Sequence, residues 1–327
     1  KRLLRHARDL LCHGRSMHLV NGNALVARLL KSALDRNVRL LTDTLVQQLL
    51  QEDQRVVGAR IERSARPFDI RARRGVVMAC GGFPHDRQRI ARQFAHAPDG
   101  AGHLSAAPKG NTGDGLRLGE SVGARVASDL PHAAAWAPVS RVPREDGGFS
   151  GSPHLMERAK PGFLAVRQDG RRFVNEADSY HDYMCALFDA CGPEEPPVSW
   201  LICDHRAQRR YGLGWSKPFP FPTASHVRMG YLIKDPTLAG LARQCGIDAQ
   251  QLEATVNSFN QFAEKGCDPQ FRRGESLYNQ NQGEILHGPN PSLGSLRQGP
   301  FYAVKLVPGS LGEMAHRVHD HQRAFPP

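Results

Sequence analysis

No stretch of the 327-residue sequence stays apolar over the roughly 20 residues needed to cross a bilayer. The basic start of the chain also lacks the apolar run that marks a secretory signal. Cysteine is scarce: the seven residues are odd in number and show no CxxC spacing, which argues against a disulfide framework or a zinc site. We therefore expect a cytoplasmic protein with no membrane span and no metal site.

The net charge of the chain does not settle the class of partner. The formal value of +11 leaves nucleic acid open as a partner. No recognisable nucleic-acid-binding module accompanies the basic residues, however, and they are spread in twos and threes along the chain. Arginine clusters equally suit a dinucleotide pyrophosphate or an anionic substrate. We expect a solvated basic surface and no nucleic-acid partner.

One stretch, RGVVMACGGF, combines a short apolar run with paired glycines. Val76 to Ala79 is rich in β-branched residues and lies between Gly75 and the pair Gly81-Gly82. This pattern predicts a strand that is buried on both faces inside a parallel sheet. Glycines after such a strand let a ligand approach the backbone, at the edge where open α/β sheets bind their ligands. A simple turn is the alternative.

The segments before this stretch predict one helix and several strands. Residues 23–34 place apolar side chains at helical spacing. Residues 38–41 form a first expected strand, and residues 44–50, 56–61 and 70–73 predict a β-meander. The expected order is a helix, a strand and an antiparallel meander, after which the chain returns to a buried strand. This order is typical of the middle of a dinucleotide-binding domain.

A second glycine-rich loop, KGNTGDG, follows an expected helix over residues 86–94. Residues 116–124 come directly after this loop and contain small residues with helical periodicity, so they predict a helix. The loop therefore lies at the N-terminus of that helix. Free backbone N–H groups and the positive end of the helix dipole lie at that point, together with Asp114. Either the Gly-Asp-Gly sequence is simply a cap, or it presents a carboxylate and amides to a cofactor.

The composition changes near residue 125, where prolines and loops become frequent. Residues 162–176 predict a hairpin with Asp-Gly at its turn, residues 198–204 a strand and residues 252–262 an amphipathic helix. We expect an α/β fold with an inserted α+β cap. The expected domains are residues 1–124 and 298–327 for the cofactor domain and 125–297 for the cap.

These segments, taken in order, resemble the flavoproteins of the fumarate reductase and 3-ketosteroid dehydrogenase superfamily. The resemblance implies a Rossmann-like FAD-binding domain of the glutathione reductase type, and FAD as cofactor. It rests on ACGGF at 79–83, NTGDG at 111–115, GRRFVNE at 170–176, GID at 246–248, FNQF at 259–262 and GPFYA at 299–303. The positions that match cofactor contacts are Val46, Ala79, Gly81, Gly82, Thr112, Gly113, Asp114 and Gly115.

Two departures favour the ketosteroid dehydrogenase branch. Fumarate reductases carry an arginine shortly after the Asn-Glu pair and a histidine after the Phe-Tyr-Ala strand, whereas this chain has Tyr180 at the first position and no histidine at the second. The resemblance implies dehydrogenation of a 3-oxosteroid-like ring, with an electron acceptor as the second partner. Tyr302 would polarise the ketone and Tyr180 would serve the proton transfer. A fumarate- or urocanate-type reductase and an inactive remnant remain alternatives.

Two features of the family are missing. The family opens with a strand and a GxGxxG turn that holds the FAD pyrophosphate, and this sequence contains no such turn. Residues 313–327 also match nothing in the family, and we expect no metal at His316, His319 and His321. These departures predict an internal fragment of a flavoenzyme that binds flavin weakly. The oligomeric state stays open.

Overall fold

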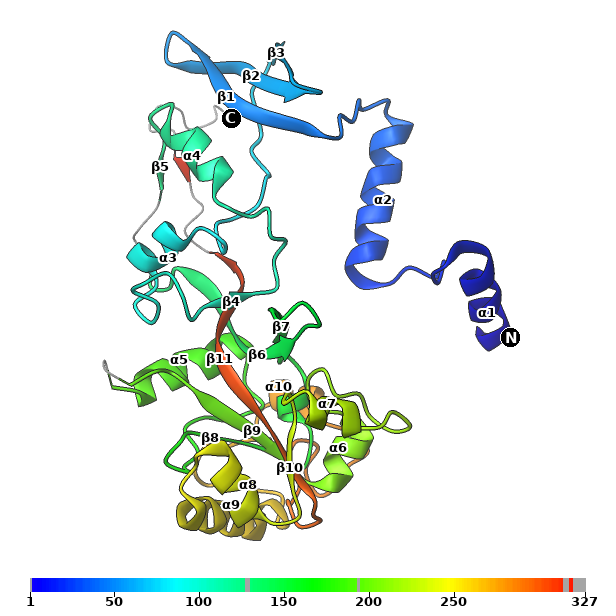
Figure 1. Ribbon diagram of the computed structural model, residues 1–327, viewed down its shortest axis with the longest axis vertical. Coiled ribbons are helices and arrows are strands. Elements are labelled where there is room, and N and C mark those ends of the chain that lie inside the picture. The colour runs from blue at the N-terminus through cyan, green and yellow to red at the C-terminus, as the bar shows by residue number, and fades with distance from the viewer. Residues whose placement is uncertain (1, 127–129, 193–194, 314–317, 320–327) are drawn as a thin grey trace. The chain divides into compact units, whose positions relative to one another are not determined.

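The computed structural model describes residues 2–126, 130–192, 195–313 and 318–319, which fall into two compact units, residues 1–76 and 77–327 (Figure 1). The division at residue 76 differs from the expected domain boundaries at 124/125 and 297/298, which stay predictions. Unit 1 contains α1 (Arg2–His13), α2 (Asn21–Asp35), β1 (Thr44–Glu52), β2 (Arg55–Arg63) and β3 (Arg66–Arg71).

Unit 1 confirms the predicted helix and meander. The expected helix 23–34 lies within α2, and β1, β2 and β3 form an antiparallel sheet in that order. Val20 occupies the N-cap position of α2 and makes no side-chain capping hydrogen bond. Residues 38–41 form no strand but an irregular link to β1, and no strand of unit 1 pairs with them. The apolar face of α2 is exposed, with Leu25, Val26 and Leu29 each about 60% accessible.

The predicted buried strand over Val76 to Ala79 is wrong. These residues form no regular structure, they link the two units, and Val77 is 90% exposed. The physical reason is that a central parallel strand needs a hydrogen-bonded neighbour on each side. The part of the chain that the structure describes places no strand beside them. An apolar run alone therefore does not make a strand.

Unit 2 is built on a seven-stranded sheet whose centre is the long strand β11 (Phe301–Glu313). The strand order is β7-β6-β11-β9-β8, and β4 and β10 also pair with β11. The other strands are β4 (Leu104–Ser105), β6 (Ala134–Pro143), β7 (Phe149–Pro153), β8 (Phe163–Val166), β9 (Ser199–Cys203) and β10 (Ile233–Asp235); a separate two-stranded pair joins β5 (Arg125–Val126) to β12 (Val318–His319).

Helices accompany this sheet, and several of them begin at a capping side chain. Asp86 caps α3, Ser179 caps α5 and Asp248 caps α9, each accepting hydrogen bonds from backbone N–H groups of the first turn. The predicted helices 86–94 and 252–262 are thereby confirmed. The helices are α3 (Arg87–Gln93), α4 (Asp114–Glu120), η1 (Glu157–Ala159), α5 (Tyr180–Ala190), α6 (His205–Tyr211), α7 (Ala224–Arg228), α8 (Leu238–Cys245), α9 (Ala249–Ala263) and α10 (Leu277–Gln282).

The sheet separates two hydrophobic cores because β8 and β9 are buried on both faces. Leu164 and Ile202 belong to the core that contains α8 and α9, whereas Phe163 and Leu201 belong to the core that contains α5. This alternation is the period of two expected of a strand. The predicted strand 198–204 is confirmed as β9.

The hairpin predicted over residues 162–176 is half right. The turn forms, because the Arg167 N–H donates to the Arg171 carbonyl oxygen at 3.0 Å. Residues 171–176 are not a strand, however, and β8 pairs with β9 instead. The second arm turns inward because Arg172 and Glu176 belong to a buried ion cluster.

This buried ion cluster consists of Arg172, Glu176, Asp268 and Arg273. Arg172 donates to Glu176 at 2.7 Å and to Asp268 at 2.8 Å, and Arg273 donates to Glu176 at 3.0 Å. Burial would raise the pKa of the Glu176 carboxyl, but the two arginines and the Ala165 N–H lower it to about 2. The cluster ties the segment before α5 to the segment after α9.

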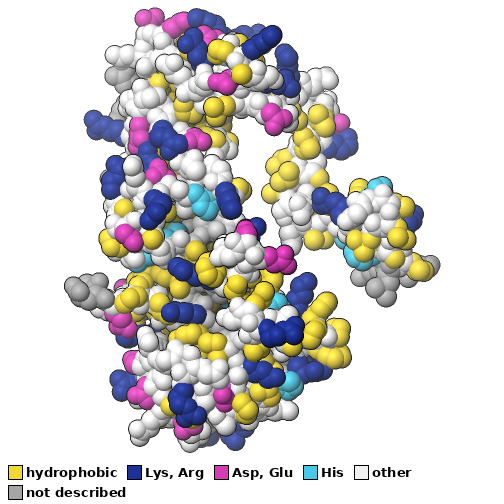
Figure 2. Space-filling model, in the orientation of Figure 1, with side chains coloured by type: hydrophobic (Ala, Val, Ile, Leu, Met, Phe, Trp, Pro, Cys, Tyr) yellow, Lys and Arg dark blue, Asp and Glu magenta, His cyan; other side chains and the backbone are white. Residues whose placement is uncertain are grey.

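Lys and Arg side chains are scattered over the visible face and interleaved with acidic ones (Figure 2). This distribution agrees with the expected solvated basic surface. Within the described residues, no helix combines the length and the apolar character that a bilayer-spanning segment needs.

We predict that Glu176→Gln destabilises the protein by about 3–5 kcal/mol, because it leaves two buried arginines without their shared carboxylate. Glu275→Gln is the matched control, since Glu275 is exposed and pairs only with Arg272, and it is expected to cost less than about 1 kcal/mol. Urea unfolding of both variants measures the difference. An equal loss of unfolding free energy in Glu176→Gln and Glu275→Gln would contradict the stabilising role of the cluster.

The depressed pKa of Glu176 also predicts how stability depends on pH. A carboxyl whose pKa is lower in the folded chain stabilises the fold above its ordinary pKa of 4.5 and loses this contribution as pH falls toward 2. Glu157, whose pKa is also about 2, adds to the same loss. Thermal unfolding between pH 5 and pH 2, a window set by these two pKa values, should show a shallower fall in Glu176→Gln than in wild type. Parallel curves would refute this assignment.

Candidate functional site

The two glycine-rich segments of the sequence pack against each other in unit 2. The Gly113 N–H donates to the Gly82 carbonyl oxygen at 3.0 Å, and the His85 N–H donates to the Asn111 carbonyl oxygen at 3.2 Å. Gly81 lies directly against the Asn111 side chain. The structure therefore brings Gly81 and Gly82 together with the segment that contains Asn111 and Gly113, whereas the cofactor contacts of Ala79, Gly81, Gly82 and residues 112–115 stay predictions.

The second loop ends at α4 and exposes polar groups there. Gly113 is the N-cap, with a φ of +80° that favours glycine. Asp114 begins the helix, is exposed and contacts the Thr112 hydroxyl at 3.2 Å and the Arg117 guanidinium. The first N–H groups of any helix lack partners inside that helix. A carboxylate, a hydroxyl and free N–H groups thus lie at one edge.

Val46, the remaining expected cofactor contact, lies in unit 1. It occupies β1 opposite Ile61 and is 41% exposed. Its contact with the cofactor stays a prediction.

Tyr180 is the first residue of α5 and is half-buried. Among the described residues, no group forms a hydrogen bond with its hydroxyl. The next residue, His181, accepts a hydrogen bond from the Trp136 N–H at 3.2 Å, and Trp136 pairs with Ser310 on β11. The start of α5 is therefore fixed near the Ser310 end of that strand.

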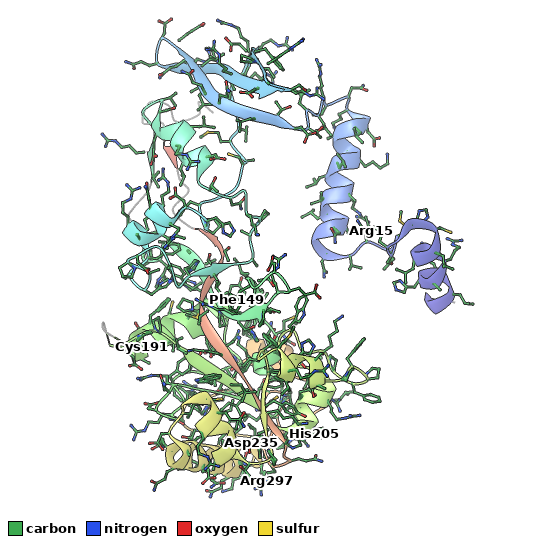
Figure 3. All side chains as sticks on the ribbon, in the orientation of Figure 1. Arg15, Phe149, Cys191, His205, Asp235 and Arg297 are labelled. Carbon is green, nitrogen blue, oxygen red and sulfur yellow. The ribbon has the colours of Figure 1, made fainter. Side chains whose placement is uncertain are left out.

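Tyr302 lies toward the other end of β11, opposite Cys203. It is only 2% exposed, and its hydroxyl contacts His205 Nδ1 at 3.2 Å. Burial raises the pKa of its phenol. Its ring stacks on His205, and Figure 3 labels His205 at some distance from Phe149, which belongs to the cavity described below.

Tyr180 and Tyr302 lie on different elements, and no hydrogen bond joins them within the described residues. His181, next to Tyr180, is tied through Trp136 to the Ser310 end of β11, and Tyr302 and Ser310 are eight residues apart on that strand, which corresponds to roughly 26 Å at the rise of a β-strand. The assignment of both phenols to one ring stays a prediction.

A cavity of about 680 Å³ opens in unit 2 beside β6 and β11. Ser140, Tyr231 and His96 line it, with Phe149 and Val307 among the apolar residues of its wall. His96 is part of an aromatic cluster with Phe94, His103, Trp136 and Phe188. Burial lowers the pKa of His96 to about 4 and that of His103 to about 3, so both rings are neutral at pH 7. The cavity wall is thus uncharged around His96, whereas Arg141, Glu195 and Lys305 add charged side chains elsewhere in the lining.

Sequence reasoning missed the polar residues of this cavity. Ser140 and Tyr231 are distant in sequence and carry no motif, and only the pairing of β6 with β11 reveals the place of Ser140.

His132, His181 and Cys185 also converge, with donor atoms within 4.8 Å of one another. A metal is nevertheless disfavoured here. The Trp136 N–H donates to His181 Nδ1, so the proton of the neutral ring lies on Nε2. Metal-binding histidines show the reverse arrangement, in which the nitrogen away from the metal donates a hydrogen bond.

Comparison with known proteins identifies the family. Residues 2–315 match the family described as FAD binding domain, and the chain belongs to it. It is 36% identical to a 4-oxocyclohex-2-ene-1-carboxylate 5-dehydrogenase of Sinomonas cyclohexanicum (96% of this chain, 53% of the relative). It is also 36% identical to a 3-oxosteroid 1-dehydrogenase of Mycolicibacterium smegmatis (89% and 51%). The chain spans about half the length of these curated relatives.

The fold agrees with this assignment. The crystal structure of 3-ketosteroid Δ1-dehydrogenase from Sterolibacterium denitrificans, in complex with 1,4-androstadiene-3,17-dione, matches with a TM-score of 0.85 and 32% identity. The match covers 95% of this chain and 56% of the other. The expected α/β FAD-binding fold and the expected cofactor, FAD, are thereby confirmed.

The residues at the start of α4 fit such a cofactor. FAD carries ribose and ribityl hydroxyl groups, which suit the exposed Asp114 carboxylate, and phosphate oxygens, which suit helix N–H groups. We predict that Asp114→Asn weakens FAD binding about 10-fold, because a hydrogen bond to a charged group contributes about 1.5–3 kcal/mol. Asp189→Asn, an exposed aspartate of α5, is the control. Flavin absorbance after equilibrium dialysis measures both, and an unchanged affinity in Asp114→Asn would exclude this contact.

Proposed function

We propose that the chain is part of an FAD-dependent oxidoreductase that introduces a double bond next to the ketone of a ring. The observation that carries this proposal is that Tyr180, half-buried at the start of α5, has a hydroxyl without a protein partner among the described residues. The next residue, His181, is bonded to the backbone of Trp136, a member of the aromatic cluster. Two relatives at 36% identity are named for dehydrogenation of ring ketones, one a steroid and one a cyclohexene carboxylate. A flat apolar ring of either kind suits an aromatic cavity.

The chain's own residues supply binding and proton transfer. The loop before α4 would hold FAD through Asp114 and neighbouring N–H groups. When bound, FAD supplies the acceptor for the hydride that leaves the substrate. Tyr180, in its phenolate form, would take the proton from the carbon next to the ketone, which is acidic only while the ketone oxygen is polarised. The neutral rings of His96 and His103 and the indole of Trp136 would exclude water from this side.

The test supplies the part of the relatives that this chain does not cover. In a chimaera, residues 2–313 replace the matching segment of the M. smegmatis relative, and reduction of a dye by 4-androstene-3,17-dione or 4-oxocyclohexanecarboxylate is followed. We predict dye reduction with at least one ketone. Oxidation of reduced viologen by fumarate, without ketone oxidation, would instead support the reductase alternative.

We predict that Tyr180→Phe lowers kcat in this chimaera by about 100- to 10,000-fold, the usual contribution of a positioned acid or base. Tyr302→Phe is the matched control and should leave kcat within a few-fold of the unsubstituted chimaera, because Tyr302 is buried against His205. A large loss of kcat in Tyr302→Phe, with little loss in Tyr180→Phe, would instead assign the proton transfer to Tyr302.

A further inference from the structure

One stretch of unit 2 combines an excess of positive charge with exposed aromatic side chains. Residues 205–234 contain six Lys and Arg and no Asp or Glu, although the whole chain has 32 acidic residues. All six are exposed, and within the described part of the chain only Arg210 forms an ion pair, with Glu284 at 3.4 Å. The stretch therefore presents positive charge that no carboxylate neutralises. Its basic residues are Arg206, Arg209, Arg210, Lys217, Arg228 and Lys234.

Three aromatic residues of this stretch, Trp215, Phe219 and Phe221, are exposed to solvent, and we call them the aromatic patch. They lie in the loop between α6 and α7, and their exposed fractions are 56%, 63% and 56%. Single exposed apolar residues are common on any protein surface, but several large ones in one loop are typical of an interaction site. The loop is therefore a candidate binding surface.

The basic residues and the aromatic patch share one surface. Arg209 Cζ lies 4.2 Å from the centre of the Phe219 ring, and Lys217 Nζ lies 5.2 Å from the centre of the Phe221 ring. Hydrophobic side chains lie beside Lys and Arg side chains at the edge of unit 2 where α6 and α7 are found (Figures 1 and 2). A partner of this surface must therefore suit apolar rings and positive charges together.

The backbone that holds the aromatic patch is anchored to the interior of unit 2. Leu213 and Ser216 are fully buried, and each donates its N–H to the carbonyl oxygen of the other, at 2.8 Å and 3.0 Å. The Phe219 N–H donates to the Arg209 carbonyl oxygen of α6 at 2.9 Å. Buried contacts on both sides of Trp215 thus fix the loop, and the rings are exposed because the fold directs them outward.

We propose that the aromatic patch and the basic residues around it bind the surface of an anionic lipid bilayer. Trp and Phe side chains are favoured at the boundary between headgroups and acyl chains, where the three rings would lose contact with water. The lipid phosphates would attract the Lys and Arg side chains, which raises affinity about fivefold per residue. This inference is independent of the proposed function, because no residue of the patch lines the cavity.

Nucleic acid and a second copy of the chain suit the same observations less well. Bases stack on free aromatic faces, whereas a cation already lies over one face of Phe219 and one face of Phe221. A phosphate backbone also offers no hydrocarbon in which large apolar side chains can be buried, and a bilayer does. Contact between two identical patches would bring the same unpaired cations of both copies together, which is unfavourable.

The protein contains its own probe of insertion. Of its three tryptophans Trp215 is exposed, whereas Trp136 and Trp200 are 5% and 7% exposed. The chain is titrated with vesicles of phosphatidylcholine and phosphatidylglycerol in equal parts, and tryptophan emission and co-sedimentation are followed. We expect a shift of the emission to shorter wavelength and quenching by brominated acyl chains, because the indole enters the boundary layer. Vesicles of phosphatidylcholine alone should bind more weakly, because they carry no net negative charge.

Phe221→Ala tests the patch. We predict that it lowers the affinity for anionic vesicles about 10-fold, the effect of removing one aromatic side chain from an apolar environment. Phe262→Ala is the matched control and should stay within about twofold of wild type. Phe262 on α9 is also exposed, and Lys265 Nζ lies 5.9 Å from its ring centre, so the control removes a similar aromatic–cation pair outside the patch. Thermal unfolding checks that both variants are folded.

The lipid surface is excluded as partner if the emission does not shift, or if Phe221→Ala and Phe262→Ala bind vesicles equally well. Tighter binding to single-stranded oligothymidylate than to vesicles, lost in Phe221→Ala, would assign the patch to nucleic acid instead. A dimer in sedimentation velocity that Phe221→Ala dissociates would assign it to a second copy. The chimaera repeats the vesicle titration, and vesicle binding by the chain that the chimaera lacks would show that the patch is covered in the longer protein.

Discussion

The shared carboxylate of Glu176, held between Arg172 and Arg273, is the contact on which the described part of unit 2 most depends. It lies at the end of a segment that would otherwise form the second arm of a hairpin, and it pulls that segment under β8. Four residues later α5 begins, so the position of Tyr180 follows from an ion pair. The guanidinium of Arg158 also binds the Glu176 carbonyl oxygen, which fixes the same backbone from the opposite side.

This arrangement explains why a buried charge persists in a place where apolar packing is often as stable. The cluster joins two stretches of chain that have no strand pairing in common: residues 163–176, which include β8, and the segment after α9. Hydrogen bonds with defined directions set the register of those stretches, whereas apolar contacts would allow them to slide. The position of the start of α5 is therefore set by the buried ion cluster, whose members lie outside the proposed ligand sites.

The sequence predicted local structure well and long-range placement poorly. Helical periodicity identified α9, and the helix expected over residues 86–94 is found as α3. The strand at Val76 to Ala79 failed because strand formation depends on neighbours that local composition does not reveal. The joint site of Tyr180 and Tyr302 stays a prediction, because the two residues lie on α5 and β11 and local sequence does not fix how those elements are placed. Ser140 and Tyr231 carry no motif, and only the fold brings them together.

The central claim is that a ring ketone binds in the cavity lined by Ser140, Tyr231 and His96. A crystal structure of the chimaera with a bound ring ketone tests it most directly. The account predicts that the ring lies in this cavity, against His96 and Val307. A ring bound instead at Tyr302 and His205 would contradict the account.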